Sequence, residues 1–232
     1  MDNKEFIEAL NGCADFLSKM VGKTDALLYG RIIFIGAHGT GKSTLAKELS
    51  SILSMPVVES VAREAAKDFR ILENECMISS NIPERDRKNA YQKVLCSMSY
   101  WDFMRWVGAE VPCIMTRCPL DTIAYAMADD DITNHTTSEC LKVLQEDDKF
   151  RKALESSLFV YLPIEFGIED DGVRPTDVVF QSLVDAAMRK LMGMFGIPPL
   201  VVSGTVEERL NSILQYIVMR SLKKAIWGNG KN

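Results

Sequence analysis

The segment from Gly36 to Ser43 matches the pattern G-x-x-x-x-G-K-[ST] in full and carries the clearest chemistry in the sequence. Glycines in this pattern let the backbone curl until successive N–H groups point at phosphate oxygens. Lys42 adds a positive charge near the β- and γ-phosphates of a nucleoside triphosphate, and the Ser43 hydroxyl is suited to ligate Mg²⁺. We therefore expect ATP and Mg²⁺ as cofactors. The residues expected around the ATP phosphates are Gly36, Ala37, His38, Gly39, Thr40, Gly41, Lys42, Ser43 and Thr44, of which His38 is interpreted as a spacer and not as a base.

The sequence on either side supplies the elements that would position this loop. Residues 31–35 (RIIFI) are almost wholly apolar, as is typical of a parallel strand covered on both faces, and residues 42–53 have the pattern of a helix. That helix would direct its N-terminal dipole at the bound anion. Further strands are predicted at 56–59, 112–116, 157–162 and 200–203, and further helices at 61–106 with a break near 81–83, at 120–127, at 139–155, at 177–195 and at 206–224.

Strands that alternate with helices predict an α/β fold, a doubly wound parallel sheet of the P-loop NTPase type with about five strands and helices on both faces. In such a sheet ligands bind at the carboxyl ends of the strands. We assign residues 30–232 to this domain. Residues 1–29 are predicted to form a helical appendage, because apolar residues recur at helical spacing over residues 4–20. Packing on the domain surface and an oligomer contact, for instance in a homo-oligomer, are both open for this helix.

The composition of the whole chain narrows the function classes. With 232 residues, of which 47% are hydrophobic and 25% charged, the chain can bury a substantial core as a globular protein. A net charge of −5 argues against an extended basic coat for gripping nucleic acid. The six cysteines include no Cys-x-x-Cys pair and there are two histidines, so no zinc site is expected. The N-terminal sequence is unlike a signal peptide and no apolar run is long enough to cross a bilayer, which predicts a cytoplasmic protein without membrane contact.

The ends of the predicted strands separate the classes of P-loop protein. The sequence contains no Asn-Lys-x-Asp segment of the kind with which GTPases read their base. The third predicted strand ends in Met115-Thr116-Arg117, without the carboxylate with which motor and AAA-type ATPases hold the metal and activate water. This pattern favours a transferase, in which the acceptor supplies the nucleophile.

Over about residues 31–215, these strand ends resemble the nucleoside and nucleotide kinase branch of P-loop proteins, and most of all the small phage and bacterial kinases related to nicotinamide riboside kinase and thymidylate kinase. The resemblance implies that Glu59, at the end of the second strand, is the general base for the acceptor. It also implies that Arg63, one helical turn on, holds an acceptor phosphate. A capping or salt-bridged pair at the start of a helix is the alternative.

The same resemblance implies that Arg117 steers phosphates, and a buried ion pair is the alternative. The family commonly has Asp-Arg-Ser or Glu-Arg-Ser at this point, whereas this sequence has Thr116 and Cys118 on either side of the arginine. Asp121 or Glu59 would then have to replace the missing carboxylate.

Two further segments carry the resemblance. Residues 169–177 follow the fourth strand, where such kinases have a lid, here a short one, and Arg174 resembles a lid arginine that closes over the transferring phosphoryl group. An acidic turn that caps the next helix is compatible with this role. Residues 203–209 follow the fifth strand, where related kinases pack the adenine through backbone contacts, although any strand-to-helix turn would look the same.

The acceptor is expected at the helical stretch between the second and third strands. Gln92 is suited to read the polar edge of a base, and nearby aromatic side chains to stack on it, although a hydrophobic helix face is the commoner explanation for them. The acceptor-side residues are thus Glu59, Arg63, Gln92 and Asp121, and the residues expected to act in catalysis are Lys42, Glu59, Arg117 and Arg174.

Three nucleotide-type acceptors fit these residues: a free nucleoside, a nucleoside monophosphate, and a 5-hydroxymethyluracil base within DNA. The last is included because the chain looks similar to phage kinases of DNA hypermodification, which would place it in the cytoplasm of an infected host. Two other hypotheses are a regulatory P-loop ATPase stimulated by a macromolecular partner and a nucleotide-binding assembly scaffold.

Overall fold

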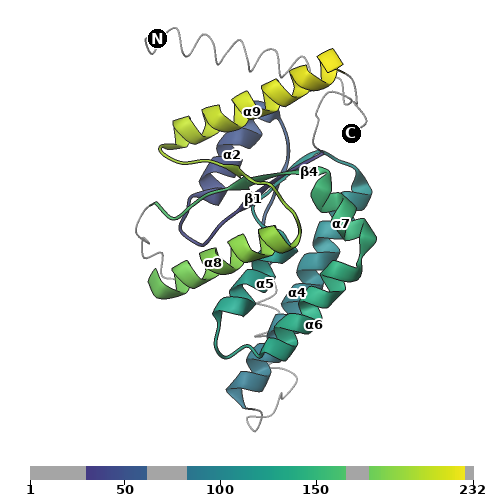
Figure 1. Ribbon diagram of the computed structural model, residues 1–232, viewed down its shortest axis with the longest axis vertical. Helices are drawn as coiled ribbons and strands as arrows, with labels where there is room; N and C mark the ends of the chain where they lie inside the picture. Colours follow the sequence, from purple (N-terminus) through teal and green to yellow (C-terminus); the bar gives the residue numbers. More distant parts are fainter. Residues whose placement is uncertain (1–29, 62–82, 166–177, 228–232) are drawn as a thin grey trace.

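The computed structural model describes residues 30–61, 83–165 and 178–227, the last range with side chains up to residue 221. Five parallel strands form one sheet in the order β2-β3-β1-β4-β5 (Figure 1). They are β1 Arg31–Ile35, β2 Val57–Val58, β3 Cys113–Met115, β4 Ser157–Tyr161 and β5 Leu200–Val201. Each strand lies within a predicted one, and the predicted α/β fold with a doubly wound parallel sheet is confirmed.

Helices cover both faces of this sheet (Figure 1). Helices α2 and α9 pack on one face, and α4, α5, α7 and α8 pack on the other, where α6 lies against α4 and α5. The bounds are α2 Lys42–Leu53, α4 Glu84–Ala109, α5 Pro119–Ala128, α6 Asn134–Glu146, α7 Asp148–Glu155, α8 Val178–Met194 and α9 Val206–Trp227.

Strand β1 lies at the centre of the sheet and is buried along its whole length. Its side chains alternate between two hydrophobic cores, because successive residues of a strand point to opposite faces. Ile33 and Ile35 pack with the helices α5 and α8, whereas Ile32 and Phe34 pack with α2 and α9. This burial on both faces is the physical reason for the continuous apolar run in the sequence.

The single helix predicted over 139–155 is wrong, because the chain forms two helices there. Helix α6 begins five residues earlier than predicted, where the Thr133 side chain accepts a hydrogen bond from the backbone N–H of Thr136 (3.2 Å). The chain then breaks at Asp147, whose carboxylate accepts from the backbone N–H groups of Lys149 (2.8 Å) and Phe150 (3.2 Å) and so begins α7. Threonine and aspartate are both favoured at N-cap positions, and a prediction from apolar periodicity alone does not take them into account.

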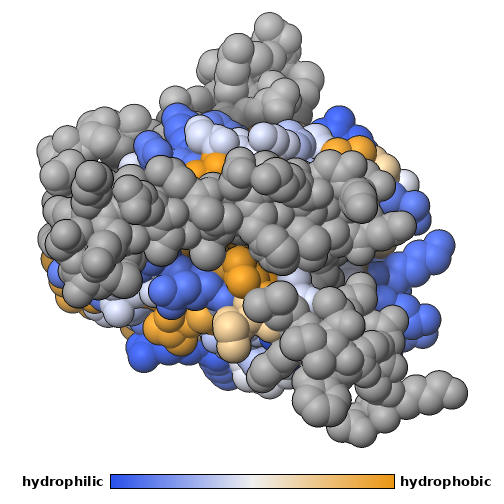
Figure 2. All heavy atoms as spheres, turned by 90° about the horizontal axis from the view of Figure 1, so that it is seen from above, coloured by the Kyte–Doolittle hydropathy of each residue, from blue (hydrophilic) through white to orange (hydrophobic). Residues whose placement is uncertain are grey.

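Several predictions from the sequence lie outside the described residues: the helix at 4–20, the division between residues 29 and 30, the helical stretch at 62–82 and the lid at 169–177. In the part of the chain that is described, no helix is long and apolar enough to cross a membrane. On the face seen in Figure 2, hydrophilic side chains separate several small hydrophobic areas.

Candidate active site

The loop between β1 and α2 takes a shape that depends on its glycines. Gly36 has φ 140°, and a Cβ atom there would lie 2.5 Å from the carbonyl oxygen of Leu162, the residue that follows β4. Gly41 caps α2 in the left-handed region with φ 87°. Between them the Thr40 hydroxyl donates to the carbonyl oxygen of Ala37 (2.9 Å). A side chain at Gly36 would push the loop away from the sheet, so the close approach requires glycine.

Lys42 lies across this loop. Its ammonium group donates to the carbonyl oxygens of Gly36 (2.7 Å) and Ala37, and the side chain is buried. The next residue, Ser43, is exposed in the first turn of α2. The loop, the lysine and the positive end of the helix dipole are therefore at one place, as the sequence predicts for a phosphate site.

The structure adds a brace for the loop that the sequence analysis did not single out. Arg209, in the first turn of α9, is 4% exposed and donates to the carbonyl oxygen of Thr40 (2.8 Å) and to the carboxylate of Glu165 (2.7 Å). Glu165 also accepts from the backbone N–H of Gly204 (2.9 Å). The hydrogen bond from Arg209, and to a smaller extent the one from Gly204, lowers the pKa of the Glu165 carboxyl. One guanidinium thus joins the phosphate loop to the segments that follow β4 and β5.

Glu59 and Arg117, predicted from two separate segments, line one small pocket at the carboxyl ends of β2 and β3. Glu59 is exposed just after β2, and Arg117 is partly buried just after β3. We call this the strand-end pocket, and its lining residues are Val58, Glu59, Ser60, Val61, Ser99, Asp102, Phe103, Met115, Arg117 and Cys118. The fold therefore brings together the two residues that the sequence assigns to proton transfer and phosphate steering.

Asp121 lies behind Arg117 and is almost fully buried. One carboxylate oxygen accepts from the backbone N–H of Cys118 (2.8 Å), as part of a capping box at the start of α5, and the other is 4.0 Å from the Arg117 guanidinium. Burial raises the pKa of the Asp121 carboxyl, and the charges of Arg117 and Lys42 oppose that rise. A carboxylate therefore stands close to both predicted phosphate-binding cations.

Thr116, at the position where a carboxylate was expected, has a structural role. Its hydroxyl donates to the carbonyl oxygen of Val58 across the β2–β3 pair (3.4 Å). The residues described hold no cluster of three or more His, Cys, Asp or Glu side chains that could bind a metal ion.

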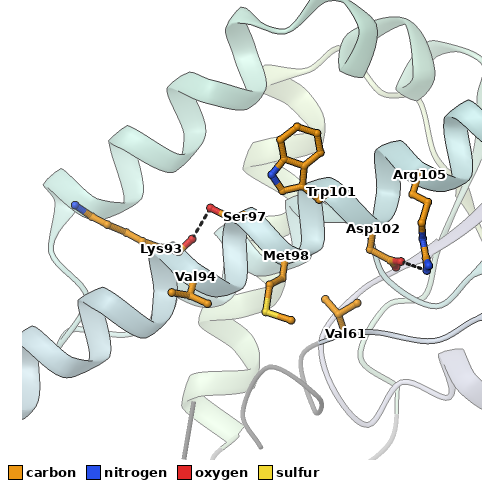
Figure 3. Close-up of a pocket in the computed structure, with 8 residues that line it drawn as sticks. All are labelled: Val61, Lys93, Val94, Ser97, Met98, Trp101, Asp102 and Arg105. Atoms are coloured by element: carbon orange, nitrogen blue, oxygen red, sulfur yellow. Dashed lines mark hydrogen bonds and ion pairs between the residues drawn. The ribbon is translucent and has the colours of Figure 1, made fainter. Parts of the chain in front are cut away.

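The face of α4 near Val61 forms a second, larger pocket of about 610 Å³ (Figure 3). We call it the α4 groove, and its lining residues are Val61, Lys93, Val94, Ser97, Met98, Trp101, Asp102 and Arg105. Its middle is apolar, with the Trp101 side chain 69% exposed, and a cation lies towards each end. Lys93 pairs with Glu139 (2.7 Å) and Arg105 with Asp102 (2.6 Å). Val61 and Asp102 line both pockets, so the groove lies next to the strand-end pocket.

Gln92 and most of the aromatic residues predicted near it point elsewhere. The amide nitrogen of Gln92 donates to the carbonyl oxygen of Thr122 (2.9 Å) and joins α4 to α5, where the side chain is buried. Phe103 is in the core and the Tyr100 hydroxyl donates to Asp147. An acceptor-reading role for Gln92 stays a prediction. The roles of Arg63 in holding an acceptor phosphate and of Arg174 as a lid arginine also stay predictions, because both residues lie outside the described residues.

The described fold is similar to several solved structures. Deoxyadenosine kinase from M. mycoides with bound dATP matches with a TM-score of 0.58 and 13% identity over 81% of this chain and 98% of that chain. The NadR protein in complex with NR matches with a TM-score of 0.57 and 19% identity over 81% of this chain and 51% of that chain. Thymidylate kinase from Candida albicans matches with a TM-score of 0.52 and 18% identity over 82% of this chain and 91% of that chain.

These likenesses show a P-loop fold of the nucleoside and nucleotide kinase type, as the strand-end residues predicted. Among curated proteins, none matches the sequence. A family model described as an AAA domain matches residues 31–209, which is most of the chain, and the chain belongs to this AAA domain family.

Proposed function

We propose that this protein is a kinase that transfers the γ-phosphoryl group of ATP to a hydroxyl or phosphate of a nucleotide-type acceptor. The observation that carries the proposal is the strand-end pocket, where Glu59 and Arg117 lie together at the same sheet edge as the phosphate loop. Phosphoryl transfer needs positioning and charge stabilisation rather than covalent help from the protein, and this arrangement suits that need.

In the proposed step, the acceptor oxygen attacks the γ-phosphorus in line as the bond to the β-bridging oxygen breaks, and ADP leaves. For a hydroxyl acceptor, the Glu59 carboxylate takes the proton. Lys42 and Arg117 stabilise the negative charge on the transferring group. Mg²⁺, which neutralises phosphate charge when bound, would be held by the Ser43 hydroxyl, with the nucleotide and water supplying its other ligands.

The α4 groove supports an acceptor with a planar base. Its apolar middle with the exposed Trp101 is suited to stacking, and the cations Lys93 and Arg105 are suited to attract anionic groups. The similar solved structures include a deoxyadenosine kinase described with dATP and the NadR protein described with NR. We propose a nucleoside or nucleoside monophosphate as acceptor, and a 5-hydroxymethyluracil base in phage DNA as its polymeric counterpart. A cytoplasmic location, that of an infected host in the phage case, goes with the use of ATP.

The test is phosphate transfer from γ-labelled ATP to a panel of acceptors. The panel contains nucleosides, nucleoside monophosphates, nicotinamide riboside, and DNA with and without 5-hydroxymethyluracil. We expect label on one class of acceptor, which would identify a kinase and its substrate together. Label that appears only as inorganic phosphate, with every acceptor unlabelled, would contradict the proposal.

Substitution of Glu59 by glutamine tests the mechanism in the same assay. With a hydroxyl acceptor, Glu59→Gln should lower kcat by about 10²–10⁴-fold and leave ATP binding intact, since a general base contributes about this much. A phosphate acceptor is already ionised and needs no base, so a small effect would indicate that class. Glu155→Gln, at an exposed position before the amino end of β4, is the matched control and should be fully active. Full activity of Glu59→Gln on a hydroxyl acceptor would remove Glu59 from the mechanism.

A partner-stimulated ATPase is the second candidate, and the match to an AAA domain family is the observation that favours it. Such an enzyme needs a residue that activates water, and in the segment 113–118 the strand is followed by Thr116 and Arg117 without a carboxylate. This candidate predicts slow ATP hydrolysis that a macromolecular partner accelerates and no phosphorylated small product.

A further inference from the structure

Tyr125 stands between the phosphate loop and the arginine of the strand-end pocket. Its hydroxyl is 3.2 Å from Nδ1 of His38, which belongs to the phosphate loop. The same hydroxyl accepts a hydrogen bond from the Arg117 guanidinium (3.4 Å), whose central carbon lies 5.0 Å from the centre of the tyrosine ring. One side chain therefore contacts both the nucleotide side and the acceptor side of the candidate active site.

The polar contacts of this hydroxyl are mutually compatible. A guanidinium can only donate, so the tyrosine oxygen accepts from Arg117, and its own proton remains available for Nδ1 of His38 in the tautomer in which that nitrogen carries no proton. The contact of Arg117 with the ring face is also attractive, since the face of an aromatic ring is electron-rich. Tyr125 thus holds the arginine by two contacts, a hydrogen bond to its hydroxyl and a cation–π contact with its ring. Removal of the hydroxyl removes the first contact and keeps the second.

His38 is held firmly enough to serve as the fixed end of this chain of contacts. It is 2% exposed, and its carbonyl oxygen accepts from the Gln181 side chain of α8 (2.7 Å). Its ring also packs near those of Tyr125 and Phe180, with centres 6.0 and 6.1 Å away. His38 was predicted to be only a spacer in the loop, whereas its side chain is part of the packing between the phosphate loop, α5 and α8.

Helix geometry explains why Tyr125 and Asp121 act on the same arginine. Both are on α5, four residues apart, so they lie on one face of the helix a single turn from each other. Asp121 lies 4.0 Å from one terminal nitrogen of the Arg117 guanidinium, and the Tyr125 hydroxyl accepts from the other at 3.4 Å. The carboxylate supplies attraction, which does not fix direction, and the tyrosine supplies the directional contact.

We propose that Tyr125 is a positioning residue that sets Arg117 relative to the phosphate loop, so that the guanidinium meets the transferring phosphoryl group. The expected effect of Tyr125 on the reaction rate rests on the proposed kinase function, whereas its effect on the position of Arg117 rests on geometry alone. Loss of the hydroxyl should therefore leave nucleotide binding intact, loosen the arginine and slow the chemical step.

The kinetic test compares the wild-type protein with Tyr125→Phe, His38→Ala and the double variant. We expect Tyr125→Phe to lower kcat about tenfold, which corresponds to about 1.4 kcal/mol, with the KM for ATP unchanged. Because both side chains act through one chain of contacts, the double variant should lose no more kcat than the more affected single variant. An unchanged kcat in Tyr125→Phe, or losses that multiply in the double variant, would overturn the proposal.

A second measurement does not depend on catalysis. The rate at which phenylglyoxal modifies Arg117 is followed by peptide mass spectrometry, with the exposed Arg105 as internal standard. Arg117 should react several-fold faster in Tyr125→Phe and in His38→Ala, while Arg105 reacts at the wild-type rate. Equal rates at Arg117 in all proteins would refute the positioning role, even if the protein is a kinase. Conversely, if Arg117 reacts faster in the two variants but the wild-type protein phosphorylates no acceptor, the positioning role is supported and the proposed function is rejected.

Discussion

Replacement of Arg209 by methionine tests whether the brace beneath the phosphate loop stabilises the fold and the nucleotide site. Methionine keeps an unbranched, flexible stem and removes the guanidinium. Two hydrogen bonds are lost, to the carbonyl oxygen of Thr40 (2.8 Å) and to the carboxylate of Glu165 (2.7 Å). The arginine side chain is 4% exposed, so water cannot easily replace these contacts.

The expected magnitude follows from the exposure of each contact. A hydrogen bond to a charged group contributes about 1.5–3 kcal/mol, and the buried bond to Thr40 should be worth about 2 kcal/mol. The Glu165 side chain is 24% exposed, and solvent screening limits that contact to about 1 kcal/mol. Relief of the desolvation of the guanidinium offsets about 1 kcal/mol. The free energy of unfolding should therefore fall by about 2 kcal/mol, and ATP binding should weaken about tenfold as Thr40 loses its support.

Urea unfolding followed by tryptophan fluorescence measures the stability change, and calorimetric titration with a non-hydrolysable ATP analogue measures the binding change. Arg151→Met is the matched control, because Arg151 is 53% exposed and pairs only with Asp148 within its own helix among the contacts described. That variant should stay within about 0.5 kcal/mol of the wild type. If Arg209→Met unfolds at the same urea concentration as Arg151→Met, the brace does not stabilise the fold and the reasoning is refuted.

Two further predictions concern the phosphate loop and the carboxylate that pairs with Arg209. Gly36→Ala should destabilise the protein by several kcal/mol and abolish nucleotide binding, since the new Cβ would lie 2.5 Å from the Leu162 carbonyl oxygen at φ 140°; a folded variant that binds ATP normally in calorimetry would contradict this. The hydrogen bond from Arg209, and then the one from Gly204, lowers the pKa of Glu165 in the folded protein. The ionised carboxylate therefore stabilises the fold above the pKa of the unfolded chain, about 4.3, and this stabilisation is lost as the pH falls through the lower pKa of the folded protein. The stability difference between wild type and Glu165→Gln should therefore shrink in urea unfolding below about pH 4, and a difference independent of pH would exclude the ionised carboxylate as its source.

Local patterns in the sequence were sufficient to predict the sheet and the phosphate loop. The three central strands β1, β3 and β4 are mainly apolar because they are buried between the two cores of the sheet, and β1 and α2 have the predicted bounds. The loop between them was predictable because its chemistry depends on neighbours in the sequence. The break at Asp147 was in principle visible too, since an Asp before a charged segment is a common N-cap.

The partner of a buried side chain across the fold was not predictable in this way. Arg209 and Thr40 are 169 positions apart, and no local pattern connects them. One signal was present, because Thr205 and Glu208 form a capping box that places Arg209 in the first turn of a helix. A cation there opposes the helix dipole, so an arginine that remains at such a position needs an acceptor elsewhere. The signal indicates that a partner exists without identifying it.

A carboxylate lies near the end of β3 even though the residue that follows this strand is a threonine. Thr116 fills the expected position and uses its hydroxyl to join β3 to β2. Asp121 supplies a carboxylate from the first turn of α5, where it is held by the backbone N–H of Cys118 (2.8 Å). Burial at that place raises the pKa of the Asp121 carboxyl, and the charges of Arg117 and Lys42, followed by the hydrogen bonds from Cys118, oppose that rise. The charges of Arg117 and Lys42 therefore favour the ionised form of Asp121, and an ionised Asp121 would in turn offset the repulsion between these two positive charges.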